Sequence, residues 1–199
     1  NKLDYKSMSM KQLNDLPLLS GIFKFSTNDF NFDLVCIKND DSSVVRFFWQ
    51  NQHDTESLDL WGNITKDPGI FIDVGSHTGL FTIVGLLSNP NNLLISIEPS
   101  FLNMGRLISN LRLNNLFKRN SRFLGAASNT SGNGLFEIYT DLSFMSKGGK
   151  LSNKGERVNV IKLDDIVINN DNRKIKGIKI DTEGEDYKVL LGATNLIKK

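Results

Sequence analysis

The fold of this chain is decided by the stretch Gly69-Ile-Phe-Ile-Asp-Val-Gly-Ser-His-Thr-Gly-Leu-Phe-Thr-Ile-Val84. Its apolar run over residues 70–74 predicts a buried strand, and residues 80–87 carry apolar side chains at helical spacing. Gly75 and Gly79 lie between these segments and predict a tight turn, because glycine adopts backbone conformations that other residues avoid. In α/β folds a strand, a glycine turn and a helix in this order form the edge that receives ligands. We therefore expect a cofactor site at this turn.

The order of residues in the turn indicates which cofactor it binds. A dinucleotide-binding turn has the spacing G-x-G-x-x-G, whereas Asp73, Gly75 and Gly79 follow D-x-G-x-x-x-G. A carboxylate at this place repels a pyrophosphate but attracts an ammonium or sulfonium group. A second expected strand, residues 93–99, contains Glu98 about 25 positions after Asp73, near the offset at which such folds place an acid against ribose hydroxyls. These features favour a ligand with an amino acid end and a ribose.

Four segments of the chain resemble the FkbM-type S-adenosylmethionine-dependent methyltransferases. They are Asp73-Val-Gly-Ser-His-Thr-Gly79 with Phe81-Thr82, Glu98-Pro99 with Asn103 and Asn110, Leu163-Asp164-Asp165, and Ile178-Lys-Ile-Asp-Thr-Glu-Gly184 with Val189-Leu-Leu-Gly-Ala193. The resemblance covers about residues 54–199, and the last segment is the most specific. It implies S-adenosylmethionine as the cofactor. It also implies an α/β, Rossmann-like class I methyltransferase fold with a mostly parallel sheet and helices on both faces.

The resemblance also implies which residues bind the cofactor. The turn from Gly75 to Gly79 would hold the methionine end, with Asp73 near its amino group, and Glu98 would accept hydrogen bonds from the ribose hydroxyls. The family has Asn more often than His at position 77, so we expect contact through the backbone there. The full predicted cofactor-binding set is Asp73, Gly75, Ser76, His77, Gly79, Glu98, Pro99, Asn103 and Ala126.

Two acidic residues, Asp181 and Glu183, are the predicted catalytic residues, because they follow the strand expected to flank the methyl group. One of them can act as general base toward a hydroxyl, or the pair can hold a divalent ion that acidifies the acceptor. The alternative is structural: Asp181 caps the following turn, and Glu183 interacts with the start of the next helix. We expect no dedicated metal site.

The resemblance implies O-methylation of a hydroxyl on a sugar, glycan or related small metabolite, which would be the acceptor. Two other functions stay open. A nicotinamide-dependent oxidoreductase has the same fold class, but the glycine order and Asp73 oppose it. The other is a non-catalytic module that keeps a methyltransferase fold for binding or assembly.

Composition excludes several classes of protein. With 199 residues, 39% hydrophobic and 23% charged, the chain can bury one sizeable core. A net charge of +2 gives no strong field toward nucleic acid or an anionic membrane, so we expect neither as a partner. No apolar run reaches membrane-spanning length and the start lacks a signal-peptide pattern, which favours a cytoplasmic location. Cys36, the single cysteine, excludes an internal disulfide and is expected to be a buried thiol. The lysines interpreted as solvated charges are Lys147, Lys150, Lys154, Lys174, Lys176 and Lys179.

The chain divides into two predicted parts. Residues 1–53 predict an N-terminal arm and a small antiparallel β element, and residues 54–199 predict the S-adenosylmethionine-binding domain. Alternating apolar and polar residues predict the strands of the β element over 21–26, 31–38 and 43–50.

The remaining elements follow from periodicity. Helices are expected over 54–65, with Leu58, Leu60 and Trp61 in the core, over 100–114 and from Glu185 onward; strands are expected over 122–128, 134–139 at a sheet edge, 158–163 and 175–180. Residues 140–156 are rich in Gly, Ser and Lys and predict a loop, either a lid over the substrate or a connection. Members of the family continue with strands that complete the sheet. We therefore expect an excerpt lacking these strands, or a partner that covers the open edge in a homo-oligomer.

Overall fold

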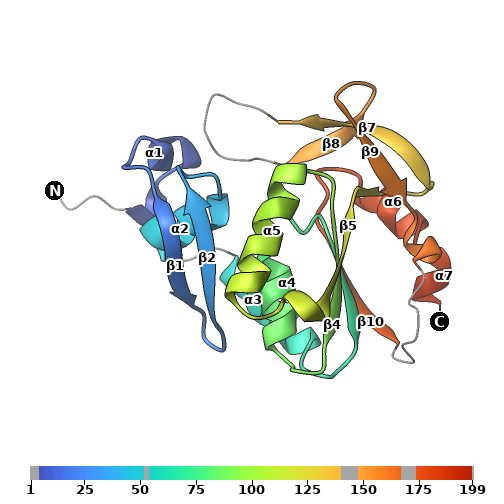
Figure 1. Cartoon of the computed structure of the whole chain (residues 1–199), viewed down its shortest axis with the longest axis horizontal. Helices are drawn as coiled ribbons and strands as arrows, with labels where there is room; N and C mark the ends of the chain where they lie inside the picture. Colours follow the sequence, from blue (N-terminus) through green and yellow to red (C-terminus); the bar gives the residue numbers. More distant parts are fainter. Residues whose placement is uncertain (1–4, 52–53, 140–147, 167–173, 199) are drawn as a thin grey trace.

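A four-stranded parallel sheet forms the centre of the molecule in the computed structural model, which describes residues 5–51, 54–139, 148–166 and 174–198 (Figure 1). In spatial order its strands are β10 (Ile175–Ile180), β3 (Ile70–Val74), β4 (Leu93–Glu98) and β5 (Asn120–Leu124). Val74 is in register with Ile97 on one side and Ile180 on the other. The carboxyl ends of β10, β3 and β4 therefore meet at one edge of the sheet.

Helices cover both faces of this sheet, as the sequence predicts. One face lies against α3 (Thr55–Ile64), α4 (Leu80–Leu87) and α5 (Phe101–Leu113), where Phe71 and Leu94 belong to one buried cluster with side chains of these helices. On the other face, Ile72 and Ile97 form a second cluster with Val189 of α6 (Asp186–Leu191). Each such fully buried side chain contributes about 1.5–3 kcal/mol. The two clusters fix the strands from which the edge is built.

A second sheet lies beside the first, and it differs from the expectation. Its strands, in spatial order, are β6 (Ala126–Ala127), β9 (Glu156–Ile161), β7 (Gly132–Ile138) and β8 (Gly149–Ser152). The single strand expected over 122–128 is divided at Gly125, where the chain leaves β4 and pairs with β9. The strand expected at an edge over 134–139 lies instead between two partners. That prediction was wrong because residues 149–152, expected in a loop, form the strand β8 that pairs with its other side.

The N-terminal part is an antiparallel hairpin with helices rather than three strands. It contains η1 (Tyr5–Ser7), α1 (Met10–Asn14), β1 (Ser20–Ser26), β2 (Asn31–Ile37) and α2 (Ser42–Gln50). The strand expected over 43–50 was wrong because Asp41 caps a helix, its carboxylate accepting from the amides of Ser43 and Val44 at 2.8 and 3.2 Å. Val44 and Phe47 then share one buried helical face, a spacing that also fits this segment.

Several smaller expectations have definite outcomes. Leu58 and Trp61 are buried, but Leu60 is 62% exposed, so its assignment to the core was wrong. The helix expected from Glu185 is two short helices, α6 and α7 (Thr194–Ile197). The remaining short elements are the 3-10 turns η2 (Phe117–Arg119) and η3 (Leu163–Asp165). Cys36 is buried as expected, and burial raises the pKa of its thiol to about 11.

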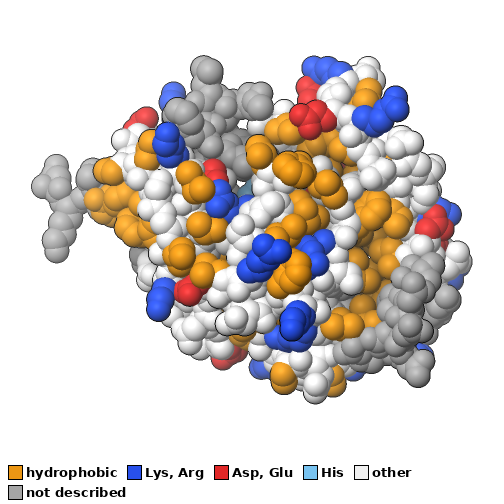
Figure 2. Space-filling view, in the orientation of Figure 1, with side chains coloured by type: hydrophobic (Ala, Val, Ile, Leu, Met, Phe, Trp, Pro, Cys, Tyr) orange, Lys and Arg blue, Asp and Glu red, His pale blue; other side chains and the backbone are white. Residues whose placement is uncertain are grey.

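Within the expected loop over 140–156, residues 140–147 lie outside the described residues, and Gly149–Ser152 form β8. In the part of the chain that the structure describes, no helix is long and apolar enough to cross a bilayer. Figure 2 shows Lys and Arg side chains scattered over one face rather than gathered into a single patch. This distribution agrees with the small net charge of +2.

Candidate cofactor and active site

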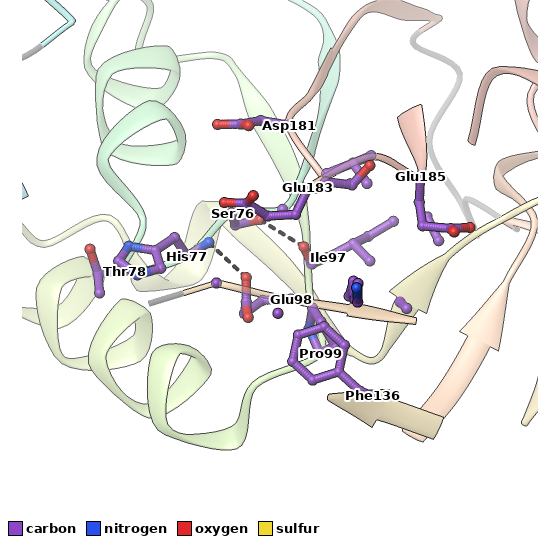
Figure 3. Close-up of a pocket in the computed structure, with 18 of the residues that line it drawn as sticks. Ser76, His77, Thr78, Ile97, Glu98, Pro99, Phe136, Asp181, Glu183 and Glu185 are labelled. Carbon is purple, nitrogen blue, oxygen red and sulfur yellow. Dashed lines mark hydrogen bonds between the residues drawn. The ribbon is translucent and has the colours of Figure 1, made fainter. Parts of the chain in front are cut away.

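A cavity of about 1040 Å³ opens at the carboxyl ends of β3, β4 and β10. The glycine turn, the end of β4, β6, β7, β8 and the segment after β10 all contribute to its lining, and so does α2 of the N-terminal part. Figure 3 shows part of this lining, with Glu98 and Pro99 from the end of β4 and Asp181 and Glu183 from the segment after β10. The volume is close to the upper end of the range of ligand sites in proteins, about 300–1,000 Å³.

The glycine turn is packed so closely that its first position requires glycine. Gly75 has φ +72°, and a Cβ atom there would lie 1.9 Å from the carbonyl oxygen of Asp181. The amides of Gly75 and Ser76 both donate to the carbonyl of Ile97, at 2.9 and 3.1 Å. The turn is thereby fixed to the end of β4 on one side and to the end of β10 on the other.

His77 takes part in the site through its backbone. It has φ +49°, and its amide donates to Oε2 of Glu98 at 2.9 Å (Figure 3). Among residues other than glycine, Asn, Asp and His are enriched in this left-handed region. The backbone conformation therefore explains why Asn and His can both stand at this position.

Glu98 is the most constrained acid of the cavity. Its side chain is 5% exposed, and Oε1 accepts from the Ser100 amide at 2.9 Å and from Nδ2 of Asn103 at 3.3 Å. Burial raises the pKa of Glu98 above its ordinary value, although the hydrogen bonds and the nearby His77 act in the opposite direction. A carboxylate has about four acceptor positions, and these two donors with the His77 amide use three of them. In the described part of the chain no further group donates to this carboxylate, so the fourth position can accept from a hydroxyl in the cavity that Glu98 lines.

Three residues of the predicted cofactor-binding set, Asp73, Gly79 and Asn103, do not line the cavity. Asn103 is buried and reaches the site only through Glu98. Asp73 is fully buried; its Oδ2 accepts from the hydroxyl of Thr82 at 2.7 Å. Its Oδ1 lies 3.3 Å from Nζ of Lys179, in an ion pair whose geometry is not that of a hydrogen bond.

Lys179 is a site residue that the sequence analysis missed. Its interpretation as a solvated charge was wrong, because the side chain is only 14% exposed and lines the cavity. Nζ donates to the carbonyl of Gly75 at 3.2 Å and lies 4.8 Å from the centre of the Phe81 ring. The sequence feature that could have identified Lys179 is its position between two apolar strand residues, Ile178 and Ile180.

Asp181 and Glu183, which the sequence analysis predicted as the catalytic pair, both line the cavity. The Asp181 side chain is 73% exposed, with Oδ2 3.7 Å from Nζ of Lys179. The turn that follows is held by Asp186, whose Oδ1 accepts from the amide of Thr182 at 2.9 Å. Glu183 has φ +47°, a conformation that costs a residue other than glycine about 1–3 kcal/mol and is concentrated at functional sites. Asp186, rather than Asp181, thus accepts from the first amide of this turn.

The charges around the cavity suit a cationic ligand. Among described residues, the acidic side chains in the lining are Asp54, Glu98, Glu137, Asp181, Glu183 and Glu185, and the cationic ones are Arg46, Lys150 and Lys179. This excess of acidic side chains fits a sulfonium nucleoside better than a pyrophosphate.

Two further features of the site concern polar groups and metals. Thr78 also lines the cavity, and its buried hydroxyl has no hydrogen-bond partner in the described part of the chain. The described residues contain no group of three or more metal-ligating side chains.

A parallel sheet with a glycine turn after one strand and an acid at the tip of the next is typical of Rossmann-like nucleotide-binding folds. The sequence model of the methyltransferase FkbM domain matches residues 73–199. The chain therefore belongs to the FkbM methyltransferase family, whose cofactor is S-adenosylmethionine.

Comparison with solved structures finds weak similarities in fold. The SAM-dependent methyltransferase from Agrobacterium tumefaciens has 11% identity and a TM-score of 0.41, over 55% of this chain and 34% of that protein. TYW2 of M. jannaschii, solved with AdoMet, has 20% identity and a TM-score of 0.40, over 55% of this chain and 45% of that one. The chain thus spans less than half of either protein. No curated protein matches the sequence.

Proposed function

We propose that this chain forms the core of an S-adenosylmethionine-dependent O-methyltransferase that acts on a hydroxyl of a sugar, glycan or related metabolite. The observation that carries the proposal is the Glu98 carboxylate: three N–H groups hold it at the edge of the cavity, and no other described residue donates to its remaining acceptor position. Family membership supports the cofactor. The hydroxyl acceptor is inferred from the resemblance and from the chemistry of the lining.

The cofactor residues have distinct tasks in this proposal. The turn from Gly75 to Gly79 receives the methionine end, and Glu98 accepts from a ribose hydroxyl. Pro99 and Ala126, which both line the cavity, border the base. When bound, S-adenosylmethionine supplies a methyl group activated by its sulfonium charge. Asp73 and Asn103 act from behind the wall, through Lys179 and Glu98 respectively.

The proton of the acceptor hydroxyl passes to one carboxylate of the pair Asp181 and Glu183. Both line the cavity, and the exposure of Asp181 leaves its carboxylate accessible to an acceptor that enters from solvent. Holding the hydroxyl against the methyl group contributes through proximity, and proton removal typically adds about 10²–10⁴-fold in rate. A hydroxyl is a poor nucleophile until its proton leaves, so this pair is the part of the site that a hydroxyl acceptor requires.

The acidic lining favours a neutral, hydroxyl-rich acceptor. Carboxylates accept hydrogen bonds from sugar hydroxyls, whereas they repel the phosphates of nucleic acids. Six lining carboxylates against three lining cations, among described residues, thus support a glycan or polyol and oppose a polyphosphate.

Transfer of a labelled methyl group from S-adenosylmethionine to a panel of acceptors tests the proposal. We expect label in sugars or glycans and none in RNA or DNA. Asp181→Asn or Glu183→Gln, whichever removes the base, should lower kcat by about 100-fold or more while S-adenosylhomocysteine affinity changes less than about twofold. Label in nucleic acid alone would contradict the acceptor class. Cofactor binding without transfer to any acceptor would favour the non-catalytic alternative.

A further inference from the structure

Helix α5 and its C-cap residue Asn114 carry three polar side chains, four residues apart, that bind the outer edge of β2. Arg106 pairs with Asp40, whose Oδ1 accepts from the amide of Ile37 at 2.7 Å. Oδ1 of Asn110 and Oδ1 of Asn114 accept from the two preceding outward-facing amides of the strand, both at 2.9 Å. Four residues of helix rise about 6 Å and two residues of strand about 6.6 Å, so the two spacings match. Figure 1 shows α5 and β2 side by side, as their contacts require.

Asn110 differs from its neighbours because it makes a second contact, in the glycine turn. Its Oδ1 accepts from the amide of Val35 in β2, and its Nδ2 donates to the carbonyl of Thr78 at 2.8 Å. The side chain is fully buried. One amide group therefore joins the N-terminal hairpin to the turn, next to the His77 amide that donates to Glu98.

The hairpin also leads into a wall of the same cavity. Helix α2 follows β2 and contributes Ser42, Ser43 and Arg46 to the lining. These residues lie outside residues 73–199, the range that the family model matches. A displacement of the hairpin would thus change the cavity wall and, through Asn110, the turn.

We propose that Asn110 is a positioning residue, which holds the glycine turn in its cofactor-binding conformation and couples the turn to the N-terminal hairpin. This inference rests on the proposed function. A carbonyl aligned by a buried amide keeps the backbone of residues 75–79 in place, and with it the amide that orients Glu98. Loss of the donor should therefore weaken cofactor binding even though Asn110 does not line the cavity.

Asn114, the C-cap residue of the same helix, provides a matched control. Its Nδ2 donates to the carbonyl of Asp33 at 2.7 Å, so Asn114 also joins α5 to β2, whereas its hydrogen bonds go to the strand and to its own helix rather than to the glycine turn. Asn110→Asp and Asn114→Asp each keep the oxygen that accepts from the strand and remove the amide donor. We expect Asn110→Asp to lower the affinity for S-adenosylhomocysteine about tenfold, the effect of losing one buried hydrogen bond, and Asn114→Asp by less than about twofold.

Isothermal titration calorimetry on the full chain measures these affinities, with near-UV circular dichroism as the check of folding. If Asn110→Asp does not fold, Asn110→Ala and Asn114→Ala repeat the comparison. Equal affinities of the two variants would overturn the positioning role while wild-type binding keeps the proposed function intact. A folded wild-type chain that does not bind S-adenosylhomocysteine would overturn both.

Discussion

At the scale of single residues, Gly75 is the position where sequence and geometry agree most closely. Its φ of +72° and the 1.9 Å that would separate a Cβ atom from the Asp181 carbonyl oxygen leave no room for a side chain. Gly75→Ala should lower the free energy of unfolding by at least about 1–3 kcal/mol and abolish S-adenosylhomocysteine binding. Gly105→Ala in α5 is the control, because a Cβ atom there would meet no atom within 4 Å; we expect unchanged or slightly higher stability. Urea denaturation measures the free energy of unfolding of both variants, and a Gly75→Ala variant as stable as wild type would contradict the geometry.

The raised pKa of Glu98 predicts how the stability of the protein depends on pH. Burial raises the pKa of its carboxyl in the folded state, so its ionisation opposes folding. Its contribution to stability is complete below the unfolded pKa and is lost as pH rises through the folded pKa. The free energy of unfolding of wild type, relative to Glu98→Gln, should therefore fall as pH rises above about 4.5 and then level off. Urea denaturation of both proteins across pH measures this difference. Parallel stability curves would refute the raised pKa.

Sequence reasoning located some site residues because they have local signals. Gly75 and Glu98 follow apolar strands, so their place at the edge of a parallel sheet could be predicted. Lys179 could not be placed in the same way, since its ion pair with Asp73 depends on the parallel pairing of β10 with β3. Asn103 was recognised, but its action through Glu98 depends on the path of α5.

At the scale of elements, a chain of buried polar side chains joins all four strands of the parallel sheet. Thr82 of α4 donates its hydroxyl proton to Asp73, so the Ser96 hydroxyl, 2.8 Å away, donates to Thr82. Nδ2 of Asn120 in turn donates to Ser96 at 2.8 Å. Lys179 completes the chain from β10. Each of the four strands therefore contributes one polar residue to a hydrogen-bonded and ion-paired series behind the glycine turn. Within this series, Lys179 compensates the charge of the buried Asp73 carboxylate.

Of these buried polar contacts, the ion pair between Asp73 of β3 and Lys179 of β10 should contribute most to stability. Lys179→Met leaves the buried Asp73 carboxylate unpaired, which should cost about 3–5 kcal/mol of stability. Adding Asp73→Asn should restore most of that loss, because no buried charge then needs a partner. A double-mutant cycle by urea denaturation measures the coupling, and strictly additive effects would show that the two charges do not interact.

Strand β3 matches the expected range because its residues are apolar apart from Asp73 and all are buried. Strand β10 matches because Ile175, Ile178 and Ile180 mark its length, although lysines and a glycine interrupt it. Helix α2 was mistaken for a strand, because its apolar residues fit both periods and the capping by Asp41 decided between them. The second sheet was not predicted, because its pairings join segments far apart in the chain.

At the scale of the whole molecule, the cavity is assembled from distant parts of the chain. Its lining runs from Ser42 in α2 to Glu185 beside α6, and β7 and β8 of the second sheet contribute Phe136 and Lys150. The sequence predicted the side formed by the glycine turn and Glu98, since these residues are close in one motif. It did not predict the sides formed by α2 and by the second sheet, because these sides arise only when the N-terminal part and the second sheet pack beside the parallel sheet.

The central claim is that this cavity binds the methionine and ribose of S-adenosylmethionine. Calorimetric titration of the full chain with S-adenosylhomocysteine, in parallel with Glu98→Ala, tests it most directly. We predict one binding site in wild type and a loss of affinity of at least about tenfold in the folded variant, because the acceptor for the ribose hydroxyl is gone. A folded wild-type chain that gives no binding heat at several temperatures, or equal affinity in Glu98→Ala, would contradict the claim.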